Sequence, residues 1–189
     1  MKQHPYCYPG TEVLRNKLDI RDAALLETVE RLDSLAGIES LSRRLPISVD
    51  GYKAIHRYIF QNIYDWAGEY RRVDTGRAGA RFCRADFIAA EMDKRFAAIH
   101  AENCLCDLDA NNFAERAAEH VGELNAIHPF LDGNGRTLRS LLDILAENAG
   151  HTFDMARIDA KQWNAASIVS FQRVDYQLMR ELIAGALVS

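Results

Sequence analysis

Apolar residues recur at steps of three and four positions through almost the entire chain of 189 residues. Such spacing places them along one face of an α-helix, so it predicts a succession of amphipathic helices. Ser48 and Asp109 precede two of these segments and are suited to cap them. No linker divides the chain, and we therefore expect one mainly helical domain, residues 1–189. The predicted helices cover residues 21–37, 48–66, 86–102, 109–127, 134–150, 153–171 and 173–188.

Two of the predicted helices and the N-terminal segment are interpreted as structural. The first helix is expected to end near Gly37 and to serve as scaffold. In the second, His56 lies beside the apolar stripe, where a single histidine is more often a packed core residue than a ligand. Residues 1–20 mix proline, glycine and aromatic residues, which predicts an ordered, non-helical arm. The apolar positions of the first helix are Leu25, Leu26, Val29, Leu32 and Leu35.

Residues 70–83 give the only strand signal in the sequence. Their ends favour β-structure and their centre contains glycine, which predicts a hairpin with Thr75 to Gly79 as its loop. An isolated hairpin is only marginally stable. It is therefore either pinned to the helices or kept as an exposed edge for a partner. We interpret its arginines as a solvated face, with docking as the alternative; they are Arg71, Arg72, Arg77 and Arg81.

Charge and cysteine content argue against several classes of function. The net charge is -4 and the isoelectric point about 5.9, which does not suit a broad nucleic-acid surface. The four cysteines are irregularly spaced and predict neither a disulfide framework nor a zinc site. Neither a leader nor a run of roughly eighteen apolar residues is found. We therefore expect a cytoplasmic protein without direct contact to nucleic acid or membrane.

The stretch from Ile127 to Arg139, I-H-P-F-L-D-G-N-G-R-T-L-R, holds most of the candidate chemistry. It joins two predicted helices, so its polar residues belong to a tight loop and to the first turn of the second helix. Gly133 and Gly135 permit positive φ and remove side chains. Successive backbone N–H groups can then converge on an anion at a helix N-terminus, and phosphate is the natural occupant.

Charged residues around this loop extend the interpretation. Arg136 and Arg139 are three positions apart and are expected to project from the same side of the helix, where they suit the β- and γ-phosphates of a nucleotide. Asp132 is a candidate Mg²⁺ ligand, together with phosphate oxygens and waters. His128 is a candidate general base, because a helix N-terminus and a cation nearby favour neutral imidazole.

A purely structural loop is the alternative, with His128 as a helix cap and Asp132 and Asn134 as turn formers. Each residue alone fits that alternative, but their joint arrangement favours catalysis. A P-loop is excluded because its lysine motif is absent, and a Rossmann site because no strand precedes the glycines. The H-E-x-x-H spacing is also absent, so His120 and Glu123 do not predict zinc catalysis.

The same stretch resembles the signature of the Fic family, H-x-F-x-(D/E)-G-N-G-R-x-x-R. Residues 8–17, 65–71 and 82–83 also resemble bacterial Fic toxins. The resemblance implies an all-α Fic fold, a bundle of about seven to eight helices with one small β-hairpin flap over the active site. Every position of the signature is matched, by His128, Phe130, Asp132, Gly133, Asn134, Gly135, Arg136 and Arg139.

The activity of the family implies a role for each of these residues. That activity is adenylylation, the transfer of AMP from Mg-ATP to a Tyr, Thr or Ser hydroxyl of a target protein. His128 would deprotonate the hydroxyl, and Asp132 would hold Mg²⁺. The glycines and Asn134 would cradle the phosphates, while Arg136 and Arg139 would orient the β- and γ-phosphates. Residues 128–139 are thus the expected catalytic loop and helix start. Trp163 beyond them is interpreted as a core residue, with a place in the adenine pocket, beside Asn164, as the alternative.

The resemblance also implies partners. The flap at residues 70–83 would hold the target by strand pairing, and related toxins modify subunits of gyrase and topoisomerase IV. In the family an inhibitory helix carries the motif (S/T)-x-x-x-E-(G/N). The sequence contains no such run, so the resemblance implies either a small separate antitoxin, with its glutamate directed at Arg139, or a toxin without this restraint.

Two alternatives stay open at this point. One is a Fic enzyme that transfers another group, although kinase-type relatives carry lysine at the position of Gly135. The other is a catalytically idle nucleotide-binding regulatory module, which the intact His128 and Asp132 disfavour.

Overall fold

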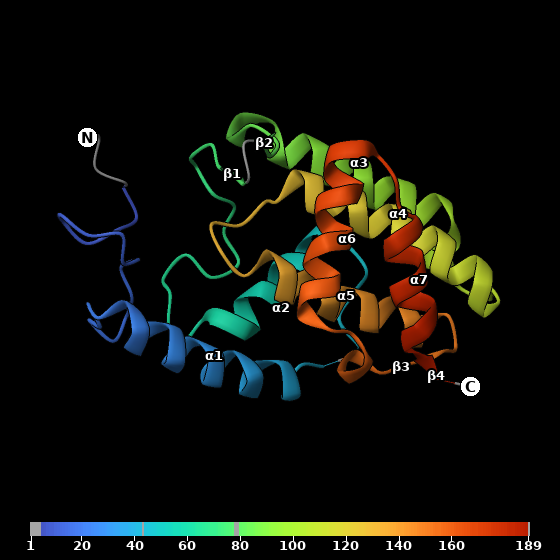
Figure 1. Ribbon diagram of the computed structural model, residues 1–189, viewed down its shortest axis with the longest axis horizontal. Helices are drawn as coiled ribbons and strands as arrows, with labels where there is room; N and C mark the ends of the chain where they lie inside the picture. Colours follow the sequence, from blue (N-terminus) through green and yellow to red (C-terminus); the bar gives the residue numbers. More distant parts are fainter. Residues whose placement is uncertain (1–4, 43, 78–79, 189) are drawn as a thin grey trace.

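The computed structural model describes residues 5–42, 44–77 and 80–188. Within these ranges the chain forms seven α-helices, and the predicted all-α bundle is confirmed (Figure 1). The helices are α1 Ala23–Glu39, α2 Val49–Phe60, α3 Ile88–Ala101, α4 Ala110–Ile127, α5 Asn134–Asn148, α6 Ala160–Arg173 and α7 Gln177–Ala186. Short 3-10 helices lie at Ala85–Phe87, Asn103–Leu105 and Met155–Arg157.

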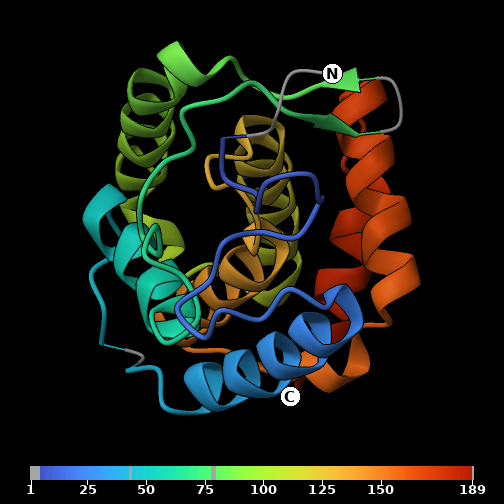
Figure 2. The ribbon, with the colours of Figure 1, turned by 90° about the vertical axis from the view of Figure 1, so that its left-hand side faces the viewer.

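Helix α4 is the centre of the bundle and contacts α3, α5, α6 and α7. Figure 2 shows α4 and α5 in the middle, with α1, α2, α3 and α6 around them. The Asp109 side chain caps α4 by accepting hydrogen bonds from the next residues, as predicted. Small residues on α4 let its neighbours approach closely; the fully buried ones are Ala114, Ala117 and Ala118. The α4 C-terminus and the α5 N-terminus meet at the loop that carries the signature.

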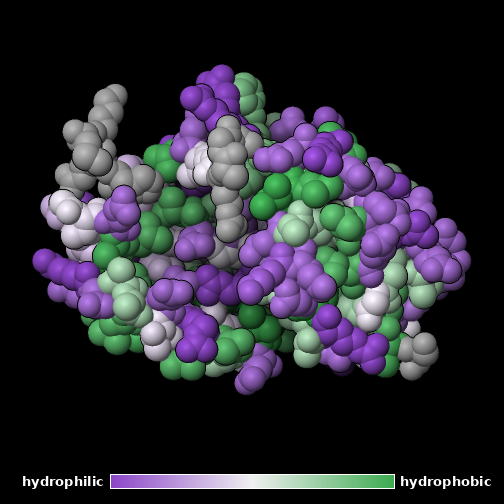
Figure 3. All heavy atoms as spheres, in the orientation of Figure 1, coloured by the Kyte–Doolittle hydropathy of each residue, from purple (hydrophilic) through white to green (hydrophobic). Residues whose placement is uncertain are grey.

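The buried face of α1 differs from the prediction. Leu25, Leu32 and Leu35 are 53%, 58% and 50% exposed, and Figure 3 shows hydrophobic side chains along the lower edge, where α1 runs. The helix instead turns Leu26 and Ser34 inward. It also continues past Gly37, where a Cβ would lie 2.9 Å from a backbone oxygen of α2. Glycine at this position allows the two helices to pack closely and does not end α1.

Helix α2 begins as predicted, because the Ser48 hydroxyl accepts a hydrogen bond from the Gly51 N–H at 3.1 Å. It ends at Phe60, earlier than predicted, and the chain continues in turns. The arm is non-helical over residues 5–20, as expected, with an isolated bridge between Cys7 and Leu14. Residues 1–4 of the predicted arm lie outside the described residues. No helix in the described ranges combines the length and apolar character needed to cross a membrane.

The predicted hairpin is present and is pinned to the helices. Strands β1 Gly76–Arg77 and β2 Ala80–Arg81 are antiparallel, with Gly76 opposite Arg81. They are shorter than predicted, and residues 78–79 of the predicted loop lie outside the described residues. The Arg71 N–H donates to the Pro129 carbonyl, and the Cys83 N–H donates to the Ala126 carbonyl. These bonds tie both ends of the hairpin to the signature loop and to α4.

Arg71 is not part of a solvated face, contrary to the prediction. It is 2% exposed, and a buried guanidinium needs hydrogen-bond acceptors around it. Its guanidinium donates to the carbonyls of Val73, Cys83, Ile127 and His128. A single side chain therefore joins the hairpin to the end of α4.

A second strand pair was not predicted. Strand β3 Thr152–Phe153 pairs antiparallel with β4 Leu187–Val188, close to the C-terminus. Each strand has two residues, too few for an alternating pattern to be recognised. The segment that is predicted as helical from residue 153 therefore begins in a short strand, and the segment that is predicted as helical from residue 173 ends in one.

We expect Arg71→Ala to lower the free energy of unfolding by about 2–4 kcal/mol, because it removes a donor from four carbonyls that are buried or partly buried. Arg72→Ala is the matched control, because the neighbouring side chain is exposed and its loss should change stability by less than about 0.5 kcal/mol. Urea unfolding followed by circular dichroism measures both. Similar losses for the two variants would contradict the role given to Arg71.

Candidate active site

The loop between α4 and α5 is closed by the side chain of Asn134, the first residue of α5. Its amide oxygen accepts from the Phe130 N–H at 2.9 Å, and its amide nitrogen donates to the Phe130 carbonyl at 2.8 Å. Both residues are buried, so these bonds satisfy peptide groups that water does not reach. The Asn134 side chain is thus committed to the loop, and only its backbone N–H is left for a ligand.

His56 supports the loop from α2. Its ring stacks on Phe130 with 3.9 Å between centroids. The Gly68 N–H donates to Nδ1 at 2.8 Å, which leaves the proton on Nε2, and Nε2 donates to the Asp132 carbonyl at 3.0 Å. Burial lowers the pKa of His56 to about 4, and the charge of Arg136 acts in the same direction. The predicted core role of His56 is confirmed.

The two glycines of the loop permit different things. Gly133 has φ +77°, and a Cβ there would lie 2.2 Å from the Phe60 ring. A Cβ on Gly135 would meet only Nη1 of Arg139, at 3.5 Å, an ordinary contact. The positive φ and the packing of the Phe60 ring therefore require glycine at position 133. At position 135 the lack of a side chain leaves the helix backbone accessible from the pocket.

The first turn of α5 presents backbone donors. Its earliest helical hydrogen bond runs from the Thr137 N–H to the Gly133 carbonyl. Among the described residues, no acceptor lies in range of the N–H groups of Asn134, Gly135 and Arg136. These donors and the positive end of the helix dipole favour an anion at this position.

His128 ends α4 in the left-handed conformation, with φ 50°. Its carbonyl accepts from Nε of Arg71 at 2.8 Å. Its ring lies face to face with that of Phe82, with 3.8 Å between centroids and 3° between planes. Because Phe82 directly follows β2, the hairpin holds the ring of the candidate base and Arg71 holds its backbone.

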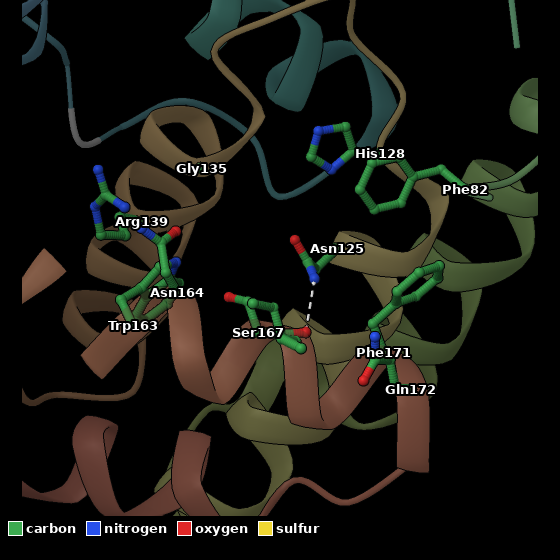
Figure 4. Close-up of a pocket in the computed structure, with 11 residues that line it drawn as sticks. Phe82, Asn125, His128, Gly135, Arg139, Trp163, Asn164, Ser167, Phe171 and Gln172 are labelled. Atoms are coloured by element: carbon green, nitrogen blue, oxygen red, sulfur yellow. Dashed lines mark hydrogen bonds between the residues drawn. The ribbon is translucent and has the colours of Figure 1, made fainter. Parts of the chain in front are cut away.

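His128 lines a pocket between α4, α5, α6 and the hairpin (Figure 4). Gly135 and Arg139 line it from α5, and Trp163 and Asn164 from α6. Trp163 is buried, as predicted, and is also a wall of the pocket, with the Arg139 guanidinium 5.7 Å from its ring centroid. The other lining residues are Phe82, Asn125, Ser167, Ile168, Phe171 and Gln172.

Arg139 brings a positive charge into this pocket. No carboxylate lies within ion-pair distance of its guanidinium among the described residues. Burial, and after it the charge of Arg136, lowers the pKa of Arg139, yet an arginine stays charged in proteins. A desolvated cation is unfavourable unless it is paired. An anion in the pocket would therefore be bound by both Arg139 and the α5 N-terminus.

Arg136 points away from this pocket, contrary to the expectation that both arginines face one ligand. Its Nη2 forms an ion pair with Glu30 of α1 at 2.5 Å, and its Nη1 donates to the Ser34 hydroxyl at 3.0 Å. Its guanidinium lies 4.5 Å from the Phe60 ring centroid. Residues three apart on a helix differ in direction by roughly 60°, and here that difference sends one arginine to α1.

Asp132 is exposed on the outer side of the loop, and its Oδ1 accepts from the Gly133 N–H at 2.6 Å. It lines a second hollow with Glu12 and other residues of the arm. The described ranges contain no group of three or more His, Cys, Asp or Glu placed to hold a metal ion. One exposed carboxylate fits Mg²⁺ only when nucleotide oxygens and waters complete the coordination.

Sequence reasoning missed several residues around the site. Asn125 donates to the Ser167 carbonyl at 3.3 Å within the pocket. Its position three residues before His128 on the same predicted helix places it on the same face, so the sequence could have indicated it. Glu30 had no such signal, because it lies 106 positions from Arg136 in the sequence.

We expect Gly133→Ala to lower the free energy of unfolding by about 2–4 kcal/mol. The new Cβ must displace the Phe60 ring, and alanine must adopt a positive φ. Gly135→Ala lies in the same turn and is the matched control, with a change within about 1 kcal/mol. Urea unfolding gives both values. A loss of equal size at Gly135 would contradict the open space described there.

His56 should make stability fall in acid. Its pKa is lower in the folded chain, about 4, than in free histidine, so the unfolded chain binds the proton more readily and stability decreases as pH drops below about 6.5. At pH about 4.5 this loss should be about 2–3 kcal/mol. Urea unfolding at neutral pH and in acid, for the wild type and His56→Gln, should show a smaller acid loss in the variant. Equal acid losses would mean that His56 is not responsible.

Comparisons with known proteins agree with this geometry. The model of the Fic/DOC family matches residues 46–146, more than half of the chain. The structure of BepC, a VirB-translocated effector protein of Bartonella tribocorum with bound AMPPNP, has a TM-score of 0.91 at 26% identity and covers 97% of this chain and 96% of that one. The N-terminal Fic domain of a putative cell filamentation protein from Bartonella quintana, with bound ADP, has a TM-score of 0.92 at 24% identity, which supports the fold alone.

Curated relatives are similar over most of the chain. It is 38% identical over 175 residues to the probable protein adenylyltransferase y4lH of Sinorhizobium fredii, covering 89% of this chain and 88% of the relative. It is 32% identical over 166 residues to the probable protein adenylyltransferase Fic of Escherichia coli, covering 86% and 82%. It is 40% identical over 172 residues to the protein adenylyltransferase VbhT of Bartonella schoenbuchensis, covering 88% of this chain but 36% of the relative. This chain belongs to the Fic/DOC family.

Proposed function

We propose that this protein is a protein adenylyltransferase, which transfers AMP from Mg-ATP to a Tyr, Thr or Ser hydroxyl of a target protein. The observation that carries the proposal is the pocket in which His128 lies beside two kinds of hydrogen-bond donor that can bind an anion. These are the Arg139 guanidinium, which has no ion-pair partner among the described residues, and the N–H groups at the start of α5. A base beside a polyphosphate site is what transfer of a nucleotidyl group to a hydroxyl requires.

The names of the relatives support the type of reaction. Of three curated relatives at 32–40% identity over most of this chain, one is named a protein adenylyltransferase and two are named probable protein adenylyltransferases. The solved structure of BepC contains the ATP analogue AMPPNP. By analogy we assign ATP as the substrate of the pocket.

In the proposed reaction the phosphates lie against the first turn of α5. The N–H groups of Gly135 and its neighbours, together with Arg139, orient the polyphosphate and stabilise the negative charge that develops on it. His128 takes the proton of the target hydroxyl as that oxygen attacks the α-phosphorus. The bond from the α-phosphorus to the oxygen that bridges to the β-phosphorus breaks, and pyrophosphate leaves. The products are an AMP ester on the target and pyrophosphate.

Asp132 is the proposed protein ligand of Mg²⁺, which would neutralise phosphate charge when bound. The carboxylate is exposed, and the His56 bond to its backbone carbonyl fixes the position of the residue. The remaining ligands would be phosphate oxygens and waters.

Two roles differ from those implied by the resemblance. The Asn134 side chain has both its oxygen and its nitrogen engaged with Phe130, so we assign it to holding the loop. The Arg136 guanidinium is engaged with α1, so we assign the side-chain contact with the phosphates to Arg139.

We further propose that the hairpin holds the target segment and that the protein is the toxin of a toxin-antitoxin pair. Phe82 stacks on His128 and follows β2, so a segment paired with this hairpin would be brought to the base. The proposed antitoxin supplies the inhibitory glutamate to Arg139. Subunits of gyrase and topoisomerase IV are the candidate targets, on the resemblance to Fic toxins, and the proposed site of action is the cytoplasm.

Incubation with Mg²⁺ and ATP labelled in the adenine ring should label a protein band in a bacterial lysate, and purified topoisomerase subunits are the first targets to test. His128→Ala should reduce the labelling about 100-fold or more, the usual size of a general-base contribution. His100→Ala is the matched control, because His100 is exposed on α3 and lines no part of the pocket.

Equal labelling by the wild type and His128→Ala would contradict the role of His128. ATP binding by the wild type without labelling of any protein would favour the idle regulatory module. Labelling of other proteins but not of topoisomerase subunits would refute the proposed target alone.

A further inference from the structure

We infer that Glu30 of α1 is a positioning residue for the nucleotide site: it anchors Arg136 and thereby fixes the loop and the first turn of α5. The inference rests on the proposed ATP site. It also gives α1, interpreted from the sequence as scaffold alone, a direct effect on how phosphate is bound.

Glu30 is the centre of a small, partly buried hydrogen-bond network. Its Oε1 accepts from Nη2 of Arg136 at 2.5 Å, and its Oε2 accepts from the Tyr64 hydroxyl. The Glu30 side chain is 13% exposed and that of Arg136 is 24% exposed. Ser34, one turn further along α1, accepts from the other terminal nitrogen of Arg136. Glu30 and Ser34 of α1 therefore hold this arginine, and Tyr64, which follows α2, holds Glu30.

Tyr64 keeps the second oxygen of the carboxylate occupied. Burial, and after it the hydrogen bond to Glu30, raises the pKa of Tyr64, so its hydroxyl remains a donor. Glu30 thus has both oxygens bonded and no freedom to rotate away from Arg136. Charge-assisted bonds of this kind are the strong ones.

The network reaches the loop through Phe60. The Arg136 guanidinium lies over the ring of Phe60 at 4.5 Å. The same ring fills the space beside Gly133 so closely that a Cβ there would approach it to 2.2 Å. Contacts thus run from Glu30 through Arg136 and Phe60 to Gly133, whose carbonyl accepts the first helical hydrogen bond of α5.

The network also keeps Arg136 out of the pocket. Arg139 lines the pocket and Arg136 does not, although both belong to the same signature. Without the Glu30 charge, Arg136 would be a partly buried cation without a carboxylate partner and would move. We expect such a movement to release Phe60 and to disturb the N–H groups that face the phosphates. Adenosine has no phosphates, so its binding should be unaffected.

Calorimetric titration separates anchoring from direct phosphate contact. The variants are Glu30→Gln, which keeps the shape but removes the charge, Arg136→Gln, and the double variant. Each is titrated with ATP plus Mg²⁺ and, separately, with adenosine. Glu27→Gln is the matched control, since Glu27 is exposed on the same helix. Circular dichroism at the titration temperature establishes that each variant is folded.

We expect both single variants to bind ATP about three- to tenfold more weakly and to bind adenosine with unchanged affinity. The double variant should bind no more weakly than either single variant, because both substitutions break the same interaction. Glu27→Gln should match the wild type.

An unchanged or tighter ATP affinity in Glu30→Gln, with a large loss in Arg136→Gln, would overturn the inference, because Arg136 would then contact phosphate without Glu30. A loss of ATP affinity in the double variant equal to the product of the two single losses would overturn the inference too. Absence of ATP binding by the wild type would refute the proposed function, and the inference with it.

Discussion

The candidate site depends on the two hydrogen bonds between the Asn134 side chain and the Phe130 peptide. They close a loop whose ends are both in the left-handed region, at His128 and Gly133. A non-glycine residue in that region is strained, and Arg71 holds His128 there through its carbonyl. His56 adds a third support by stacking on Phe130. These three supports fix the loop, and with it the groups that face the pocket.

Residues of the same type serve different purposes in this loop. Gly133 is needed for the packing of Phe60, whereas Gly135 leaves the helix backbone accessible. Arg136 is paired with Glu30, whereas Arg139 lines the pocket and has no ion-pair partner among the described residues. Gly133, Asn134 and Arg136 thus hold the loop, whereas Gly135 and Arg139 line the pocket. A rigid support under a few exposed groups is what electrostatic catalysis demands.

Much of the fold followed from local sequence signals. The caps at Ser48 and Asp109 and the buried His56 are local properties of a helix, and the structure confirms them. The two errors that concern the surroundings of the site involve partners distant in the sequence. Periodicity did not reveal that α1 turns Glu30 and Ser34 inward, because their partner Arg136 lies in α5. Arg71 looked like a surface residue for the same reason, since its carbonyl acceptors at the end of α4 are more than fifty positions away.

The position of the label in ATP distinguishes transfer of AMP from transfer of a phosphoryl group. A target protein is incubated with this protein, Mg²⁺ and ATP that carries radioactive phosphorus at either the α- or the γ-position. We expect label on the target from the α-position and none from the γ-position, because pyrophosphate leaves. Label from the γ-position alone would contradict it and would show that the site transfers a phosphoryl group.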